Sequence, residues 1–271
     1  MQGISSQYLL FGVQTVRNKS MKLSLLQTET YSGNIESNLR KVECQIKGVG
    51  NTDMIVLPEL FATPLCRLDD SVLNCSPMVM EWMRKVSAFH HAAVAGSVAV
   101  RDGSQVFNRL FFISPDGTEH YYDKRHAFGS EKGLVSEGSS RVVVSYGGVR
   151  FMLAVCYDLR FPVWLRNRGD YDCLLLSANW PASRIGAWLS LTQARAIENQ
   201  CYVVGANSAG SDGVISYGGN SVVFDPFGRL LASDGHNKEA LVEVDISPTV
   251  VSDCRKLFPV LSDADRFTID I

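Results

Sequence analysis

The sequence lacks a strong charge imbalance and lacks long apolar runs. Its 26 Lys and Arg residues and 28 Asp and Glu residues leave a net charge of −2 over 271 residues. This gives neither the basic surface of a nucleic-acid-binding protein nor a polybasic membrane patch. No apolar run approaches the roughly 20 residues that a membrane-spanning helix needs. We therefore expect no nucleic-acid partner and no membrane partner.

Paired cysteines and clustered histidines are also missing. The seven cysteines are an odd number without a C-x-x-C pair, and the histidines form no cluster at metal-ligand spacing. Such cysteines indicate free thiols in a reducing compartment, so we expect a cytoplasmic protein with no metal site. Most of these cysteines should be ordinary core residues, so a functional one must be identified by its neighbours.

The N-terminal twenty residues contain only one short apolar piece, residues 8–13. No basic stretch precedes it and no small-residue cleavage site follows, so we expect no signal peptide. Met21 begins the first strand pattern. We therefore expect residues 1–20 to be a dispensable N-terminal extension and residues 21–271 to form one folded domain, which suits a chain that is 46% hydrophobic.

Strands and helices alternate in the sequence pattern at both ends of this domain, with strand pairs between them. The expected strands cover residues 21–28, 53–57, 92–100, 106–114, 119–124, 141–146, 149–155, 171–178, 201–207, 219–224, 230–233 and 240–246. One expected helix follows Asn34 as its N-cap, a second carries Met78, Trp82, Val86 and Phe89, two more cover residues 161–168 and 185–196, and a short one follows the last strand. The order predicts an α/β fold, a four-layer α-β-β-α sandwich of two mixed sheets.

Three of the predicted strands end on residues that can carry chemistry. Glu59 follows one buried strand, Lys124 ends another, and Cys156 follows the apolar run 151–155. Each has an ordinary alternative: an exposed loop glutamate, a solvated charge cluster and a buried structural cysteine. Because strand carboxyl ends tend to meet at the site in sheets of this kind, we expect a base, a cation and a thiol nucleophile to come together.

The motifs around these residues resemble the nitrilase superfamily of carbon–nitrogen hydrolases, and most of all its omega-amidase branch. The resemblance covers residues 21–271, in matching order and spacing. It rests on LPEL at 57–60, YDKRH at 122–126, CYDLRFP at 156–162, SANWP at 177–181 and RAIENQ at 195–200. It implies a nitrilase-like sandwich, a carbon–nitrogen hydrolase domain over residues 21–271, no cofactor, and assembly into a homodimer or a larger homo-oligomer.

The resemblance also implies an activity, the hydrolysis of the terminal amide of small 2-oxo acid amides such as 2-oxoglutaramate. A deaminated-glutathione amidase or a general aliphatic amidase is the enzymatic alternative, and a true nitrilase is less favoured. A non-catalytic assembly or binding module is the alternative of another class. The presence of Glu59, Lys124 and Cys156 together argues against that module.

The roles that the resemblance assigns make chemical sense. Cys156 is the nucleophile, Glu59 the general base, and Lys124 with the backbone N–H after Cys156 stabilises the oxyanion. A second glutamate supports the lysine, for which Glu131 is the candidate and Glu137 a competitor. A Cys–His pair with His126 is a less favoured alternative.

Residues for substrate binding are harder to infer. An omega-amidase must bind the far carboxylate of its substrate, for which Arg184 or Arg160 would suit. Phe61, Tyr157 and Trp180 are candidates for the pocket wall, with ordinary packing as the alternative. We expect Asp158 and Arg160 to hold the turn after Cys156, and Arg195 and Glu198 to form a structural ion pair.

Overall fold

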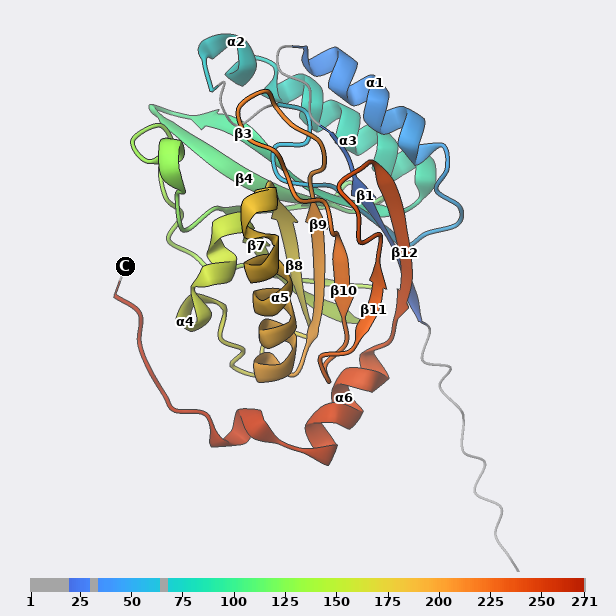
Figure 1. Cartoon of the computed structure of the whole chain (residues 1–271), viewed down its shortest axis with the longest axis vertical. Helices are drawn as coiled ribbons and strands as arrows, with labels where there is room; N and C mark the ends of the chain where they lie inside the picture. Colours follow the sequence, from blue (N-terminus) through green and yellow to red (C-terminus); the bar gives the residue numbers. More distant parts are fainter. Residues whose placement is uncertain (1–19, 30–33, 64–67, 271) are drawn as a thin grey trace, which may run out of the picture.

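Two six-stranded sheets packed face to face form the centre of the computed structural model (Figure 1). The structure describes residues 20–29, 34–63 and 68–270. The N-terminal extension predicted over residues 1–20 therefore lies almost wholly outside the described residues. A large core of apolar side chains fills the space between the sheets, as expected for strands buried on both faces.

The first sheet has the strand order β12-β1-β2-β3-β4-β5. Its three central strands β1, β2 and β3 run parallel, and the others pair antiparallel. Almost all residues of the parallel strands are buried, apart from the last two of β3, which is typical of strands covered on both sides. The bounds are β1 (Met21–Gln27), β2 (Met54–Val56), β3 (Ala93–Asp102), β4 (Gln105–Ile113), β5 (Glu119–Asp123) and β12 (Ala240–Ile246).

The second sheet has the order β11-β10-β9-β8-β7-β6, again with a parallel centre, here β7, β8 and β9. On one side β10 and β11 continue this sheet with antiparallel pairing, and on the other side β6 pairs antiparallel with β7. Its bounds are β6 (Val143–Tyr146), β7 (Val149–Val155), β8 (Cys173–Ala178), β9 (Tyr202–Asn207), β10 (Val222–Phe224) and β11 (Leu230–Ser233).

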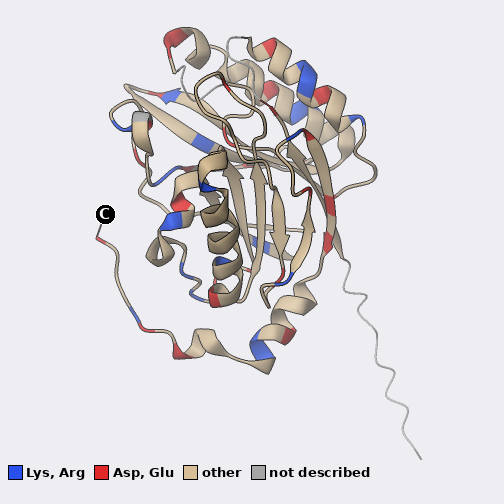
Figure 2. Cartoon of the chain, viewed as in Figure 1, with Lys and Arg blue, Asp and Glu red and all other residues tan. Residues whose placement is uncertain are grey.

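Helices cover the outer face of each sheet, so the predicted four-layer sandwich is confirmed. α1 (Ile35–Ile46) and α3 (Ser76–His90) pack their apolar faces on the first sheet. α4 (Pro162–Leu165) and α5 (Ile185–Asn199) cover the second, and α6 (Pro248–Leu257) follows β12 (Figure 1). Charged residues lie mainly on helices, loops and strand ends (Figure 2). Within the described ranges, no helix is long and apolar enough to cross a membrane.

The structure corrects the sequence-based assignment at three helices. In α3, Trp82 and Val86 are buried as expected, but Phe89 is 81% and Met78 38% exposed, because the buried face is centred on Val79 and Met83. The helix expected over 161–168 ends at Leu165, where the backbone leaves the helical region at Arg166. A short helix that the sequence pattern does not predict, α2 (Asp70–Leu73), is capped by the Asp69 carboxylate.

Candidate active site

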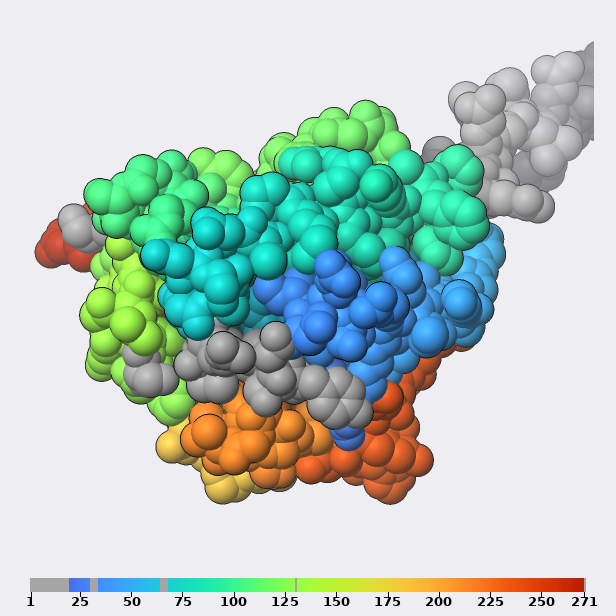
Figure 3. Space-filling model, turned by 90° about the horizontal axis from the view of Figure 1, so that it is seen from above, coloured from blue at the N-terminus to red at the C-terminus, as the bar shows by residue number. Residues whose placement is uncertain are grey.

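The carboxyl ends of strands from both sheets meet at one end of the sandwich and bring the three predicted residues together. Figure 3 shows the surface of this end, to which α1, α2 and the loop between β9 and β10 contribute. Ser177, on β8, donates its hydroxyl to the Leu57 carbonyl beyond β2 at 2.8 Å. The Asn179 N–H, just past β8, donates to Glu59 Oε2 at 2.9 Å. The two sheets are therefore joined by hydrogen bonds at the site.

Two carboxylates, one ammonium and one amide form a closed ring of hydrogen bonds. Lys124 Nζ donates to Glu59 Oε1 at 2.7 Å and to Glu131 Oε2 at 2.6 Å. Asn108 Nδ2 donates to Glu59 Oε1 at 2.8 Å and to Glu131 Oε1 at 3.0 Å. All four side chains are buried. Glu131, rather than Glu137, contacts the lysine, because the Glu137 carboxylate accepts the Ala127 N–H at 3.1 Å.

Burial and neighbouring charges shift the pKa values of this ring. Burial is the largest influence on Glu59 and raises its pKa, Lys124 opposes it, and Glu131 adds to it. Burial alone would lower the pKa of Lys124, but the attraction of Glu59 and Glu131 outweighs burial and raises it. The lysine therefore stays charged at neutral pH, and Glu59 is a stronger base than an exposed glutamate.

Cys156 begins a 3₁₀ helix, η2 (Cys156–Arg160), directly after β7. Its φ of +43° lies in the left-handed region, as does the φ of +46° at Leu60 next to Glu59. Such strained backbone is common at functional sites. Burial is the main reason that the pKa of the Cys156 thiol is raised well above its usual value, and the charge of Glu59, which also hydrogen-bonds the thiol, raises it further. This thiol therefore needs a base in order to ionise near neutral pH.

Asp158 fixes the turn after Cys156, as expected from the sequence. Its carboxylate accepts the Val155 N–H at 3.0 Å and the Tyr122 hydroxyl at 2.8 Å. It also contacts His126 Nδ1 at 2.8 Å. The His126 ring stacks on Phe161 with the ring centroids 3.6 Å apart. In the part of the chain that the structure describes, no hydrogen bond joins His126 to Cys156, so the Cys–His alternative has no geometric support.

A small pocket opens above the thiol and contains most of the predicted substrate-binding residues. Its lining consists of Phe128, Cys156, Tyr157, Arg160, Asn179, Trp180, Pro181 and Arg184. The Arg160 guanidinium lies over the Trp180 ring, 4.9 Å from its centroid, and the Arg184 guanidinium lies 5.1 Å from the Phe128 centroid. Among the described residues, neither arginine has an acidic partner within ion-pair distance.

Phe61 does not wall this pocket, so that prediction is wrong. Its side chain is fully buried and packs 5.6 Å from the Trp82 ring in the core under α1 and α3. The reason is the left-handed turn at Leu60, which directs the following residue back into the core. The predicted ion pair between Arg195 and Glu198 is confirmed at 2.8 Å.

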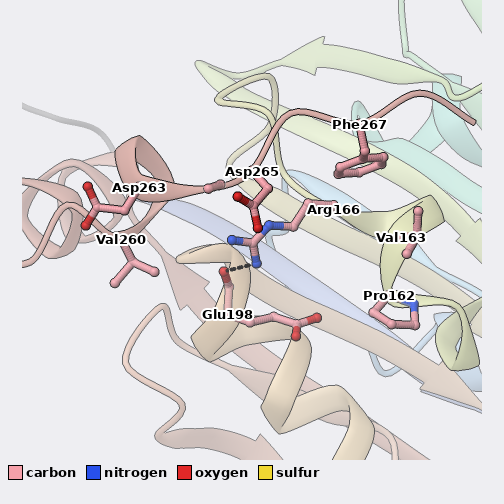
Figure 4. Close-up of a pocket in the computed structure, with 9 residues that line it drawn as sticks. Pro162, Val163, Arg166, Glu198, Val260, Asp263, Asp265 and Phe267 are labelled. Atoms are coloured by element: carbon pink, nitrogen blue, oxygen red, sulfur yellow. Dashed lines mark hydrogen bonds between the residues drawn. The ribbon is translucent and has the colours of Figure 1, made fainter.

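A second pocket lies on the far side of α4, between that helix, the end of α5 and the C-terminal segment (Figure 4). Arg166 crosses it and donates to the Glu198 carbonyl at 2.8 Å. Val163, Val260 and Phe267 provide its apolar walls. No nucleophile or base of the cluster around Cys156 reaches this pocket. Within the described residues, no group of three or more His, Cys, Asp or Glu side chains is placed to hold a metal ion.

Sequence reasoning missed three residues at the site. Asn108 lies mid-strand in β4, where its only sequence signal is an amide in the otherwise largely apolar run VFNRLFFI. Phe128 follows the predicted lysine motif without a pattern of its own. Asn179 belongs to the SANWP motif, but nothing in the sequence distinguishes its backbone N–H as the donor to Glu59.

The geometry agrees with what comparison to known proteins shows. The model of the carbon–nitrogen hydrolase family matches residues 22–256, and the chain belongs to that family. It is 39% identical over 252 residues to the omega-amidase YafV of Escherichia coli K12, covering 92% of this chain and 98% of that protein. It is 36% identical over 250 residues to the 2-oxoglutaramate amidase of Bacillus subtilis, covering 89% and 96%.

A solved structure gives the same answer. XC1258 from Xanthomonas campestris, a CN-hydrolase superfamily protein with an arsenic adduct in the active site, superposes with a TM-score of 0.87. It is 35% identical and covers 93% of this chain and 100% of its own. The prediction of a nitrilase-superfamily enzyme that hydrolyses amides is confirmed.

Proposed function

We propose that this protein is an omega-amidase that hydrolyses the terminal amide of a small 2-oxo acid amide, with 2-oxoglutaramate as the model substrate. The omega-amidase and 2-oxoglutaramate amidase relatives support this substrate class. The observation that carries the proposal is the pocket itself. A buried thiol beside a carboxylate and an ammonium forms its floor, and two arginines without acidic partners among the described residues stand in its wall.

In the first half of the reaction, Glu59 takes the proton of Cys156 as the sulfur attacks the amide carbonyl carbon. The negative charge passes to the carbonyl oxygen, where Lys124 and the Tyr157 N–H at the start of η2 stabilise it. The C–N bond then breaks, and the proton on Glu59 passes to the leaving nitrogen. Ammonia departs and a thioester on Cys156 remains.

In the second half, Glu59 takes a proton from water as the water oxygen attacks the thioester. The same donors stabilise the second oxyanion. The C–S bond breaks, the thiolate recovers the proton from Glu59, and the acid product leaves. Glu131 accepts one hydrogen bond from the lysine and keeps the ammonium between the two carboxylates. Each proton that Glu59 accepts is therefore returned in the same half-reaction.

The substrate carboxylate is assigned to Arg184, with Arg160 beside it. Both guanidiniums stack on aromatic rings and keep their N–H edges available, which suits a bidentate bond to a carboxylate. Tyr157 and Trp180 confine the carbon chain between that end and the thiol. Arg184→Gln should therefore raise KM for a carboxylated ω-amide far more than for an uncharged amide of the same length.

An assay with three substrates tests this function. Ammonia release is measured from 2-oxoglutaramate, from a deaminated peptide amide and from a simple aliphatic amide, each beside a Cys156→Ala control. A preference for the short acidic ω-amide that Arg184→Gln removes would support the proposal. Preference for either other substrate would assign the related amidase activity. No release from any of them, with Cys156 inert to iodoacetamide, would favour a non-catalytic binding module.

We also propose a homodimer formed through the helical layer over the second sheet. Three apolar side chains are exposed there: Val163 on α4, Ile197 on α5 and Phe227 in the β10–β11 turn. The turn packs on Ile197, and the end of α4 is hydrogen-bonded to α5, so these elements form one surface. In sedimentation velocity, Ile197→Asp should give monomers, whereas Phe89→Asp on the opposite helical layer should not. Unchanged dimers in Ile197→Asp would refute this interface.

We further propose that the protein acts in the cytoplasm. Its six described cysteines are free thiols, as expected for a reducing compartment. Cell fractionation with an antibody to the protein tests this location.

A further inference from the structure

The amide of Asn108 has an unusual place in the site. Its side chain is almost fully buried on β4 and is shared between the two carboxylates that hold Lys124. Its Oδ1 is also buried and has no hydrogen-bond partner among the described residues. A buried acceptor without a partner is costly, and such groups call for a functional explanation. The only polar contacts described for this side chain are its two bonds to Glu59 and Glu131.

The charge of the ring explains why an uncharged amide stands at this position. Glu59 and Glu131 together bring two negative charges, and Lys124 brings one positive charge. Asn108 completes the ring with two N–H donations but adds no charge. A cation in its place would neutralise the cluster and make Glu59 a poor base. An apolar residue would leave the buried Glu131 Oε1 without its donor, and Glu59 Oε1 with Lys124 alone.

We propose that Asn108 is a positioning residue that holds the Glu59 carboxylate ready to receive the Cys156 proton and keeps the cluster one negative charge in excess. Proton transfer from the thiol then leaves a neutral ring of Glu131, Lys124 and protonated Glu59. The transfer breaks the S–H bond and forms an O–H bond on Glu59, and the negative charge moves to the sulfur. Asn108 touches neither substrate nor sulfur in this scheme.

The titratable side chains that face Glu59 come from four different segments of the chain. They are Lys124 after β5, Glu131 in the 3₁₀ helix η1 (Gly129–Glu131), Cys156 in η2, and Tyr217 in the β9–β10 loop, whose hydroxyl donates to Asp212 at 2.6 Å. None of these groups changes when Asn108 is replaced. A hydrogen bond to an ionised carboxylate favours the ionised form, so its loss makes Glu59 hold a proton to higher pH.

The test is the pH dependence of two rates in the full-length protein. One is kcat/KM for ω-amide hydrolysis, and the other is iodoacetamide alkylation of Cys156, followed on its own peptide by mass spectrometry. In Asn108→Ala we expect the midpoint of the acid limb of both profiles to rise by about half to one pH unit. We also expect kcat to fall about tenfold or more, with KM within about twofold.

Two further variants keep the test decisive if Asn108→Ala does not fold. Asn108→Ser keeps one donor and should give a smaller rise of the midpoint. Asn108→Asp keeps the size but replaces the donor with a carboxylate, and should give the largest rise. Asn167→Ala is the matched control, because Asn167 is an equally buried amide that bonds only backbone groups and Asn199 near α5. It should lower stability and leave both midpoints unchanged.

The inference rests on the proposed amide hydrolysis, but the alkylation profile separates the two. If the unaltered protein did not hydrolyse ω-amides but Asn108→Ala still raised the alkylation midpoint, the proposed function would be refuted and the role of Asn108 would stand. Midpoints that stay unmoved in every folded Asn108 variant would refute the positioning role, even if kcat fell.

Discussion

Glu59 and His126 are the two candidates for the base that activates Cys156, but only Glu59 has the contacts of a base. Its carboxylate is bonded to Lys124, Asn108 and the Asn179 N–H, and it hydrogen-bonds the thiol. Glu59→Gln should therefore lower kcat at least about 100-fold, the usual minimum for losing a general base. Ammonia release under saturating substrate measures it.

His126→Asn is the matched comparison for that variant. The His126 ring stacks on Phe161 and contacts Asp158, so its loss should affect stability and leave much of the turnover. If His126→Asn abolished turnover while Glu59→Gln kept it, a Cys–His mechanism would have to replace the one in which Glu59 is the base.

The raised pKa of the Cys156 thiol makes a prediction about pH. Because burial and the Glu59 charge hold its pKa well above the usual value, the thiol does not ionise by itself near neutral pH. In the native protein, alkylation of Cys156 should therefore rise with pH as Glu59 loses its own proton, whose pKa burial has raised. In Glu59→Gln, burial still raises the pKa of the thiol although the Glu59 charge is gone, so the rise should no longer follow the titration of Glu59 and should appear only at more alkaline pH, as followed by mass spectrometry. Equal profiles for the two proteins would contradict Glu59 as the base.

The contrast between Glu131 and Asn108 shows what sequence can predict of such a site. Glu131 is one of two acidic candidates in a loop after the lysine motif, and only the folded structure distinguishes it from Glu137. Asn108 has no motif and no characteristic spacing. Its importance arises from the register of β4 beside β3 and β5, which brings one mid-strand side chain under two carboxylates.

The connection between β5 and η2 is the element that aligns the lysine with the nucleophile. The Tyr122 hydroxyl at the end of β5 donates to Asp158 in η2 and accepts from Trp164 in α4 at 3.0 Å. Tyr122→Phe leaves both of those groups buried without this partner. We expect it to lower the free energy of unfolding by about 1–3 kcal/mol and to reduce kcat several-fold. Urea unfolding and steady-state kinetics measure the two effects.

Tyr146→Phe provides the control for the loss of a tyrosine hydroxyl. Tyr146 also packs against the core, and its hydroxyl bonds the Asp53 carbonyl at 3.2 Å, at the opposite end of β2 from Glu59. This variant should lose some stability and retain kcat. A kcat loss of the same size in both variants would show that the Tyr122 contact has no special role in alignment.

Strands are predicted better than helices in this chain. The buried strands β2, β7, β8 and β9 are continuous apolar runs bounded by polar turns, a pattern with few competing interpretations. The position of α3 is predicted correctly, and Trp82 and Val86 on its predicted face are buried, but apolar Phe89 in its last turn is exposed. The α2 helix is one turn long, too short for any periodicity to reveal it.

In the whole molecule, the first described strand, β1, lies in the interior of a sheet and not at its edge. β1 is hydrogen-bonded to β12 on one side and to β2 on the other. A protein that starts at Met21 should therefore keep the urea midpoint and kcat of the full chain. A deletion that also removes most of β1 should give insoluble protein. Loss of soluble protein on removal of residues 1–20 alone would show that the extension is part of the fold.

The bond from Ser177 to the Leu57 carbonyl joins the two sheets beside the catalytic cluster. Glu59 and Lys124 follow strands of one sheet and Cys156 follows a strand of the other. Any sliding of one sheet over the other would therefore change the distance between the base and the nucleophile. A slip of about 1 Å would leave every strand intact and still cost roughly 100-fold in rate. The turnover rate therefore depends directly on the alignment of the two sheets. As denaturant is added, it should fall before circular dichroism records any loss of structure.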